Sequence, residues 1–265
     1  MLKERSNEII VPSPLTGGGE TIKVDAWALS YRELNAKLRG LLSNGAQRIE
    51  LHNVYGQRYI GTDLDKPVEI EIFGTPGNGL GAFMDGPKII VHGNAQDGCG
   101  NTMNNGEIVI HGHAGHILGL SARGGKIFVR DDVGYRAGIH MKEYQDKKPM
   151  VVIGGTAQDF LGEYMAGGIL VLLGLNLKEG EQHRANFIGT GMHGGAIYVR
   201  GEIHEFQLGK EIGVAEPDRN DYLVLRELIR EFGDHFGYNA EEILTYKFTK
   251  LFPLYLRPYG RLYAY

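Results

Sequence analysis

The segment Ile70-Glu71-Ile72-Phe73-Gly74 is the first of a series of short apolar segments that recur along the middle of the chain. The others occupy residues 89–93, 108–112, 127–131, 151–153, 170–174 and 197–201. Most steps between them are 19 residues long, and the two longer steps contain insertions at about 142–149 and 175–187. A fixed period near 20 residues with one apolar segment per unit is typical of a solenoid, in which each repeat packs on its neighbours.

The stretches between these segments repeat as well. A glycine stands at the same register in each repeat, and we call these residues the turn glycines: Gly61, Gly81, Gly100, Gly119, Gly138, Gly162 and Gly189. Three residues later a second register holds Leu64, Met84, Met103, Ala122, Met141, Met165 and Met192. Because glycine adopts positive φ without steric cost, the glycines are expected to form turns. The second register is expected to form a core ladder, since methionine fills irregular apolar space.

Two features of the repeat indicate a parallel β-helix. In each apolar segment the first and third residues are aliphatic, as in Ile108 and Ile110, which is the alternation of a strand. A repeat of 19 residues holds two or three short strands with tight turns, but not a strand and a packed helix with their connections. We therefore predict an all-β solenoid, a single-stranded right-handed parallel β-helix of about seven 19-residue coils stacked at ~4.8 Å per coil.

The sequences that flank the repeats predict helices. Residues 30–44 begin with a capping box, Ser30 with Glu33, and continue with leucines on one face. Residues 219–237 have the pattern of a second amphipathic helix, and a third is expected to end before Pro253. The expected role of these N- and C-terminal helices is to cap the open ends of the solenoid, which would otherwise expose strand edges.

Composition limits the class of protein. The 265 residues carry a net charge of −4 and the pI is about 6.2, so a nucleic-acid-binding surface is not expected. No apolar run approaches the ~20 residues of a membrane-spanning helix and the start lacks a secretory core, so we expect a cytoplasmic protein without membrane contact. The one cysteine, Cys99, excludes a cysteine-ligated iron–sulfur cluster and an intrachain disulfide within this chain. We expect one domain in three parts: an N-terminal segment with its capping helix at 1–48, the β-helix at 49–206, and C-terminal helices with a tyrosine-rich tail at 207–265.

Four longer motifs resemble a known family. They are Tyr55-Gly-Gln-Arg-Tyr-Ile-Gly, Gly74-Thr-Pro-Gly-Asn-Gly-Leu-Gly-Ala-Phe-Met-Asp-Gly, Gly93-Asn-Ala-Gln-Asp and Asn186-Phe-Ile-Gly-Thr-Gly-Met-His-Gly-Gly. Over about residues 22–203 the chain is similar to the C-terminal GXGXG domain of the glutamate synthase large (alpha) subunit. More distantly, it resembles the formylmethanofuran dehydrogenase subunit that has the same coil pattern.

The resemblance implies a β-helix without catalytic residues that holds an amidotransferase and a flavin barrel in position. Because this chain contains neither module, the implied partners are a glutamine amidotransferase subunit and an FMN-barrel synthase subunit on separate chains. FMN and an iron–sulfur cluster are expected on those partner chains, and no cofactor is expected on this one. Assembly into a homo-oligomer is left open.

Two motifs that suggest catalysis or nucleotide binding also have structural interpretations. Residues 189–194 fit the pattern G-x-G-x-x-G, but a strand follows them, whereas a dinucleotide-binding loop opens a helix. We therefore interpret them as a corner of the solenoid. Asp131 and Asp132, with Asp97 in a preceding coil, resemble the acidic clusters of β-helical polysaccharide-cleaving enzymes, which leaves an independent carbohydrate-active enzyme as a third functional alternative.

The histidines form a further candidate cluster. His92 and His111 are one coil apart and are expected to stack on the outer face, and His113 and His116 follow in the next turn. Two or three histidines within reach of one another could bind a metal ion. A hydrogen-bonded ladder or a partner-facing surface is the favoured interpretation, so no metal site is predicted.

The insertions and the tail are the predicted partner contacts, because insertions in solenoids tend to gather on the binding face. The candidate residues are Tyr144, Lys147, Glu181, His183, Arg184, Tyr259 and Tyr263. The favoured function is a non-catalytic scaffold of a glutamate synthase-type enzyme, which makes glutamate from glutamine and 2-oxoglutarate. The alternative is a scaffold of another oxidoreductase, such as a formylmethanofuran dehydrogenase-like complex.

Overall fold

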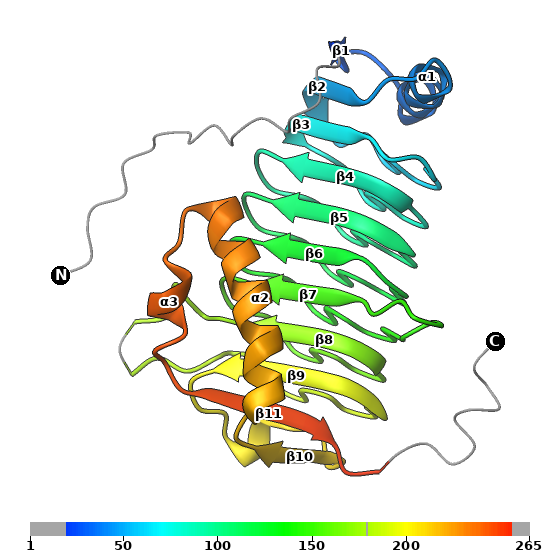
Figure 1. Cartoon of the computed structure of the whole chain (residues 1–265). Coiled ribbons are helices and arrows are strands. Elements are labelled where there is room, and N and C mark those ends of the chain that lie inside the picture. The colour runs from blue at the N-terminus through cyan, green and yellow to red at the C-terminus, as the bar shows by residue number, and fades with distance from the viewer. Residues whose placement is uncertain (1–19, 179, 256–265) are drawn as a thin grey trace.

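The computed structural model describes residues 20–178 and 180–255, which form a stack of strands with one helix at an end and another along a side (Figure 1). The parallel strands follow one another along the stack in chain order: β1 (Thr21–Asp25), β2 (Arg48–Tyr55), β3 (Glu69–Thr75), β4 (Asp85–Val91), β5 (Asn105–Ile110), β6 (Lys126–Val129), β7 (Met150–Ile153), β8 (Ala166–Leu172) and β9 (Gly194–Arg200). Two antiparallel strands, β11 (Phe248–Pro253) and then β10 (Ile212–Ala215), extend the sheet beyond β9. The helices in the described ranges are α1 (Tyr31–Ser43), η1 (Glu205–Gln207), α2 (Arg219–Phe236) and α3 (Ala240–Ile243).

Each turn of the chain places one strand against the previous strand. Ile70 of β3 lies opposite Ile89 of β4, and Ile89 lies opposite Ile108 of β5. The same column continues through Ile127, Val151, Leu170 and Ile197. This is the register that the 19-residue repeat predicts, and the parallel β-helix is confirmed. The solenoid has about 6 turns, slightly fewer than expected. The expectation counted the seven strands β3 to β9, whereas a turn is the step from one strand to the next.

The solenoid interior is filled by the inward-facing residues of the strands and by the register that follows the turn glycines. The residues of that register are all buried in the inner apolar cluster: Leu64, Met84, Met103, Ala122, Met141, Met165 and Met192. They share it with the strand columns that pass through Ile70 and Ile72. Since a β-strand directs alternate side chains to opposite faces, the middle residue of each strand points out of the solenoid.

These outward residues form a second apolar cluster between the sheet and α2. Its sheet side includes Ile90, Val109, Phe128, Val152, Val171 and Tyr198. Its helix side includes Leu225, Leu228, Ile229 and Phe232. The strands upstream carry charge at the equivalent positions, Glu50 and Glu71, and are not part of this cluster. The apolar outward residues therefore account for where the helix lies.

Each turn glycine is the centre of a corner in which three alternate residues have left-handed backbone. The glycines themselves have φ between 63° and 75°. The residue two before and the residue two after each one also have positive φ, as in Gly79 and Phe83 around Gly81. We call these the first and third corner positions. This alternation explains the spacing G-x-G at Gly79–Gly81, Gly98–Gly100 and Gly189–Gly191, because glycine is the residue that adopts left-handed backbone at least cost.

Helix α1 forms as predicted and packs at the N-terminal end of the stack (Figure 1). Its capping box is complete, with Glu33 N donating to Ser30 Oγ at 3.3 Å and Ser30 N donating to Glu33 Oε2 at 2.9 Å. Asn35 Nδ2 joins the helix to the first coil by donating to the carbonyl oxygen of Arg58 at 3.0 Å.

The C-terminal elements differ from the expectation that helices cap that end. Helix α2 runs along the side of the stack, across the strands (Figure 1), where Lys126 Nζ lies 2.6 Å from Glu231 Oε1. The predicted third helix is limited to α3, and residues 248–253 form β11 instead. This strand pairs with β9, and it contributes Phe248 to the apolar cluster under α2 and Leu251 to the inner cluster. The end of the sheet is therefore formed by strands. In the part of the chain that the structure describes, no helix is both long and apolar enough to cross a bilayer.

Candidate interaction surfaces

The first insertion folds back onto the coils before it. Tyr144 and Lys147 pair through their backbones, at 3.1 and 3.0 Å, and Lys147 Nζ lies 3.2 Å from Asp85 Oδ1. The guanidinium of Arg123 lies 5.9 Å from the centre of the Tyr144 ring. Both predicted contact residues are thus half-buried and already engaged within the chain.

The second insertion lies at the opposite ends of the strands, because it follows β8 whereas the first precedes β7. Glu181 and Arg184 are exposed there, as a partner contact requires. His183 is 5% exposed, and its Nε2 lies 3.1 Å from the Arg200 carbonyl oxygen. Burial lowers the pKa of His183, so the residue is a neutral anchor inside the loop. Its prediction as a partner contact was therefore wrong, and the two insertions do not form one face. Tyr259 and Tyr263 lie outside the described residues.

A surface that the sequence reasoning missed lies at the corners of the later coils. Its members occupy the first or third corner positions or precede them, and we call the set the corner patch: Tyr135, Arg136, His140, Phe160, Tyr164 and Phe187. The rings form two stacks along the solenoid. Phe160 and Phe187 are 5.0 Å apart between centroids, with Arg136 4.6 Å above Phe160. His140 and Tyr164 are 5.4 Å apart with an interplanar angle of 11°.

The residues of the corner patch lower the stability of the fold. Tyr164 is 46% exposed and Phe187 is 50% exposed, so each ring leaves much of its apolar surface in water. Both residues also have positive φ, 52° and 56°, a conformation that is strained for bulky side chains. Other coils place glycine at these same positions, as at Gly98 and Gly191. Bulky aromatic residues at a glycine register were the signal in the sequence.

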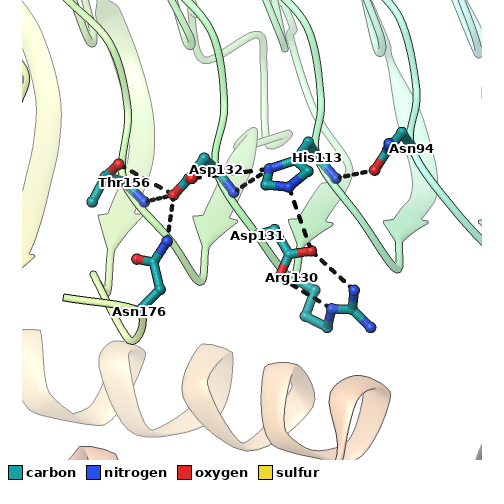
Figure 2. Close-up of polar contacts among 7 residues, drawn as sticks. All are labelled: Asn94, His113, Arg130, Asp131, Asp132, Thr156 and Asn176. Atoms are coloured by element: carbon teal, nitrogen blue, oxygen red, sulfur yellow. Dashed lines mark hydrogen bonds and ion pairs between the residues drawn. The ribbon is translucent and has the colours of Figure 1, made fainter. Parts of the chain in front are cut away.

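The polar candidates His113, Asp131 and Asp132 belong to a ladder that links one coil to the next (Figure 2). Asn94 Oδ1 accepts from His113 N at 2.8 Å, His113 Nδ1 accepts from Asp132 N at 3.2 Å, and Asp132 Oδ1 accepts from Thr156 N at 2.6 Å. These bonds hold His113 with an unprotonated Nδ1. Burial alone would raise the pKa of Asp132, but the hydrogen bonds that its carboxylate accepts from Thr156 and Asn176 lower it.

The remaining acidic and histidine candidates are used in the same way. Asp131 pairs with Arg130 at 2.9 Å (Figure 2). In a parallel ladder, Asp97 Oδ1 accepts from His116 N at 2.7 Å. Each carboxylate that suggested a cleaving enzyme therefore has a structural partner in a neighbouring residue or coil.

The outer histidines stack as predicted. His92 and His111 are 5.5 Å apart between ring centroids with an interplanar angle of 23°, and Phe73 stacks on the other side of His92. The ring of Phe236 meets His111 edge-on, at an interplanar angle of 79°. Burial, together with the positive groups of His92, Arg130 and His235, lowers the pKa of His111 to about 4. Within residues 20–178 and 180–255, no three His, Cys, Asp or Glu side chains are grouped to hold a metal ion.

Cys99 is enclosed in its coil. Its Sγ donates to the Gln96 carbonyl oxygen at 3.2 Å, and burial, with the nearby Asp97 charge, raises the pKa of the thiol to about 12. A thiol in this state is a poor nucleophile, because the thiolate is the reactive form.

Comparisons with known proteins agree with this architecture. The chain is 49% identical over 255 residues to the uncharacterized protein MJ1350 of Methanocaldococcus jannaschii, covering 93% of this chain and 98% of that protein. Its fold is similar to a chain in the crystal structure of the formyltransferase/hydrolase complex (FhcABCD) from Methylorubrum extorquens in complex with methylofuran. That similarity has a TM-score of 0.56 at 17% sequence identity and covers 85% of this chain and 91% of that chain. The pattern described as GXGXG motif matches residues 44–257. The chain therefore belongs to the GXGXG motif family.

Proposed function

We propose that this chain is a non-catalytic scaffold subunit of a glutamate synthase-type oxidoreductase, which forms glutamate from glutamine and 2-oxoglutarate. The solenoid holds a glutamine amidotransferase subunit and an FMN-barrel synthase subunit in position, and FMN and an iron–sulfur cluster belong to the partner chains. The observation that carries the proposal is the GXGXG repeat over residues 44–257, whose corners present the exposed corner patch.

The architecture suits a rigid spacer. Every coil is hydrogen-bonded to the coils before and after it, both through the sheet and through side-chain ladders such as Asn94–His113–Asp132. In a solenoid each repeat is positioned by its neighbours, so the distance between two bound modules is set by the number of coils between them.

The corner patch suits a protein partner. Tyrosine, phenylalanine and arginine are enriched in the buried centres of protein interfaces, where they contribute most of the binding free energy. Arg136 is already held in place, with its Nε 2.8 Å from Glu163 Oε2, so little side-chain entropy is lost when a partner covers it.

A second candidate is a scaffold of a formylmethanofuran dehydrogenase-like complex. The similarity in fold to a chain of the FhcABCD complex favours it. The two candidates share the scaffold role and differ in the catalytic chains that are bound.

Purification of the tagged full-length chain from its source cells, followed by mass spectrometry, separates the candidates. We expect an amidotransferase and a flavin-barrel protein in stoichiometric amounts. Recovery of formyltransferase and molybdenum or tungsten enzyme subunits instead would favour the second candidate. A chain that is recovered alone under gentle conditions and that cleaves glycans would contradict both.

A further inference from the structure

Two exposed histidines bond one coil to the next through their rings. His113 Nδ1 accepts from Asp132 N at 3.2 Å, and His116 Nδ1 accepts from Tyr135 N at 3.1 Å. In each pair the partners are 19 residues apart, so both bonds join the coil that follows β5 to the coil that follows β6. We call these two bonds the histidine rungs.

The equivalent bonds one coil earlier end on oxygen atoms instead. Asn94 Oδ1 accepts from His113 N at 2.8 Å, and Asp97 Oδ1 accepts from His116 N at 2.7 Å. An amide or carboxylate oxygen remains an acceptor at neutral pH, whereas an imidazole nitrogen that takes up a proton becomes a donor. Of the side chains that make these bonds, histidine is the one whose charge changes between about pH 5 and pH 8.

Both rings are open to protons from the solvent. The His113 side chain is 56% exposed, and His116 is exposed as well. Because Nδ1 accepts a hydrogen bond, the neutral ring carries its hydrogen on Nε2, and a second proton must enter at Nδ1. That proton occupies the lone pair to which the backbone N–H of Asp132 or Tyr135 donates. A protonated ring therefore cannot keep its rung.

Carboxylates around His113 stabilise the protonated ring. Asp132 Oδ2 lies 4.0 Å from His113 Nδ1, and Asp131 Oδ2 lies 4.0 Å from its Nε2 (Figure 2). Arg130 partly offsets the second carboxylate, because it pairs with Asp131 at 2.9 Å. The hydrogen bonds that Asp132 accepts from Thr156 end on its other oxygen, Oδ1. Oδ2 is therefore placed to accept from a protonated Nδ1 in exchange for the lost rung.

We propose that His113 and His116 form a pH-sensitive link in the solenoid: each takes up a proton from water at Nδ1, its rung opens, and the amide of Asp132 or Tyr135 is released to solvent. The closed rung excludes the proton, so the rungs are closed at higher pH and open as the pH falls. At His116 the groups that face the ring are the Asp97 carboxylate of the preceding coil and the Tyr135 ring, 5.3 Å away between centroids.

Opening of the rungs leaves the sheet in place. Strands β5 and β6 stay paired from Glu107 to Ile110, because their backbone bonds do not involve these rings. Tyr135, however, belongs to the corner patch, and a partner must order it again once its amide is released. We therefore expect the partner chains to bind more weakly at acidic pH. This consequence rests on the proposed function, whereas the opening of the rungs does not.

Residue-resolved hydrogen exchange of the full-length chain, measured at about pH 7.5 and about pH 5.5 and expressed as protection factors, tests the link. The amides of Asp132 and Tyr135 should lose protection by up to about tenfold at the lower pH, since each loses one hydrogen bond. The amide of Asn186 donates to Asp159 Oδ1 at 2.8 Å and is the internal control, which should keep its protection.

Asparagine variants show whether the histidines are responsible. His113→Asn combined with His116→Asn supplies oxygens that do not titrate, as Asn94 does one coil earlier, and both amides should then be equally protected at the two pH values. His193→Asn is the matched control. His193 Nδ1 lies 3.2 Å from the Gly191 carbonyl oxygen of its own coil, so the wild-type response should remain in that variant.

Other outcomes overturn the link. Unchanged protection of Asp132 and Tyr135 in the wild type, or a loss that Asn186 shares, would show that protonation does not open the rungs. A loss that persists in the double variant would show that other groups cause it. If the double variant does not fold, His113→Asn alone decides, because the response must vanish at Asp132 and remain at Tyr135.

Affinity purification at the same two pH values tests the consequence for the corner patch. We expect fewer partner chains at the lower pH for the wild type and equal amounts at both for the double asparagine variant. Equal retention by the wild type, with the rungs open in hydrogen exchange, would overturn the effect on partner binding. Partner chains that are absent at both pH values would contradict the proposed function instead, and the exchange result would still decide the link.

Discussion

A Cβ atom on Gly100 would lie 2.5 Å from Cδ1 of Ile127, because the turn glycine of one coil packs directly under the inner ladder of strand β6. Gly100 also has φ of +67°. Gly100→Ala should therefore lower the free energy of unfolding by at least the cost of left-handed backbone, about 1–2 kcal/mol, and more because of the clash. Chemical denaturation measures the change.

Gly40 is the matched control for that substitution. It lies in α1 without positive φ, and a Cβ atom there would meet nothing within 4 Å. Gly40→Ala should stabilise the protein by up to about 1 kcal/mol through helix propensity. Equal effects of the two substitutions would contradict the assigned role of the turn glycines.

The methionine register should tolerate a change of shape but not a charge. Met165 is fully buried in the inner cluster. Met165→Asp buries an unpaired carboxylate and should lower the free energy of unfolding by roughly 3 kcal/mol or more, whereas Met165→Leu should cost less than about 1.5 kcal/mol. Thermal melts of the two variants check this, and indistinguishable melting temperatures would mean that the register is not core.

Helix α2 should detach when its main anchor is removed. Phe232 is fully buried between α2 and the sheet. Phe232→Ala should cost about 3–5 kcal/mol, with hydrogen exchange of the α2 amides increasing more than that of the inner strands. Leu223→Ala, at a position of α2 that is exposed, should change stability by less than about 0.5 kcal/mol. Uniform loss of protection throughout the sheet would show that α2 is not a separate layer.

Stability should fall as the pH drops through the range in which His111 is protonated only in the unfolded chain. The pKa of His111 is about 4 in the folded protein against an ordinary value of 6.5, so the unfolded state binds more protons between these pH values. Stability is therefore retained above pH 6.5 and is lost progressively toward pH 4. His111→Phe retains a ring in the stack and should show a shallower decline of melting temperature with pH. Parallel curves for the two proteins would contradict the assignment.

The aromatic rings of the corner patch can be removed with little change in the stability of the fold. Tyr164→Gly combined with Phe187→Gly places glycine where other coils already have it, and relief of the left-handed strain, about 1–2 kcal/mol per site, offsets the lost ring contacts. The double variant should melt close to the wild type yet fail to retain its partner chains in affinity purification. Leu223→Ala is the matched control and should retain them; retention by the double variant would place the interface elsewhere.

The columns of the β-helix could be predicted from sequence because every coil repeats the same local interactions. One coil of 19 residues separates Ile70 from Ile89 and Ile89 from Ile108, so the repeat length alone predicts which residues pair. The position of α2 cannot be predicted from the repeat in this way. The outward residues Val109 and Phe128 do indicate that the strands bury both faces, but the helix that covers them lies about 100 residues later in the chain.

The candidate site could be predicted less completely, because it too depends on contacts between residues that lie far apart in the sequence. His183 lies in a charged insertion and was expected at the surface, but the carbonyl oxygen of Arg200, in the next strand, draws it into the interior. Phe160 and Phe187 lie in separate coils, and their stacking depends on the left-handed corners that the fold repeats. Only the replacement of corner glycines by aromatic residues was visible in the sequence.

The scaffold role is tested most directly by coupled glutamate formation with separately expressed amidotransferase and flavin-barrel chains, assayed with and without this chain. We predict that adding the chain raises the glutamine-dependent formation of glutamate, while glutamine hydrolysis and the ammonia-dependent reaction, each measured alone, change little. Full coupling of the two catalytic chains in its absence, or turnover of glutamine by this chain alone, would contradict the account.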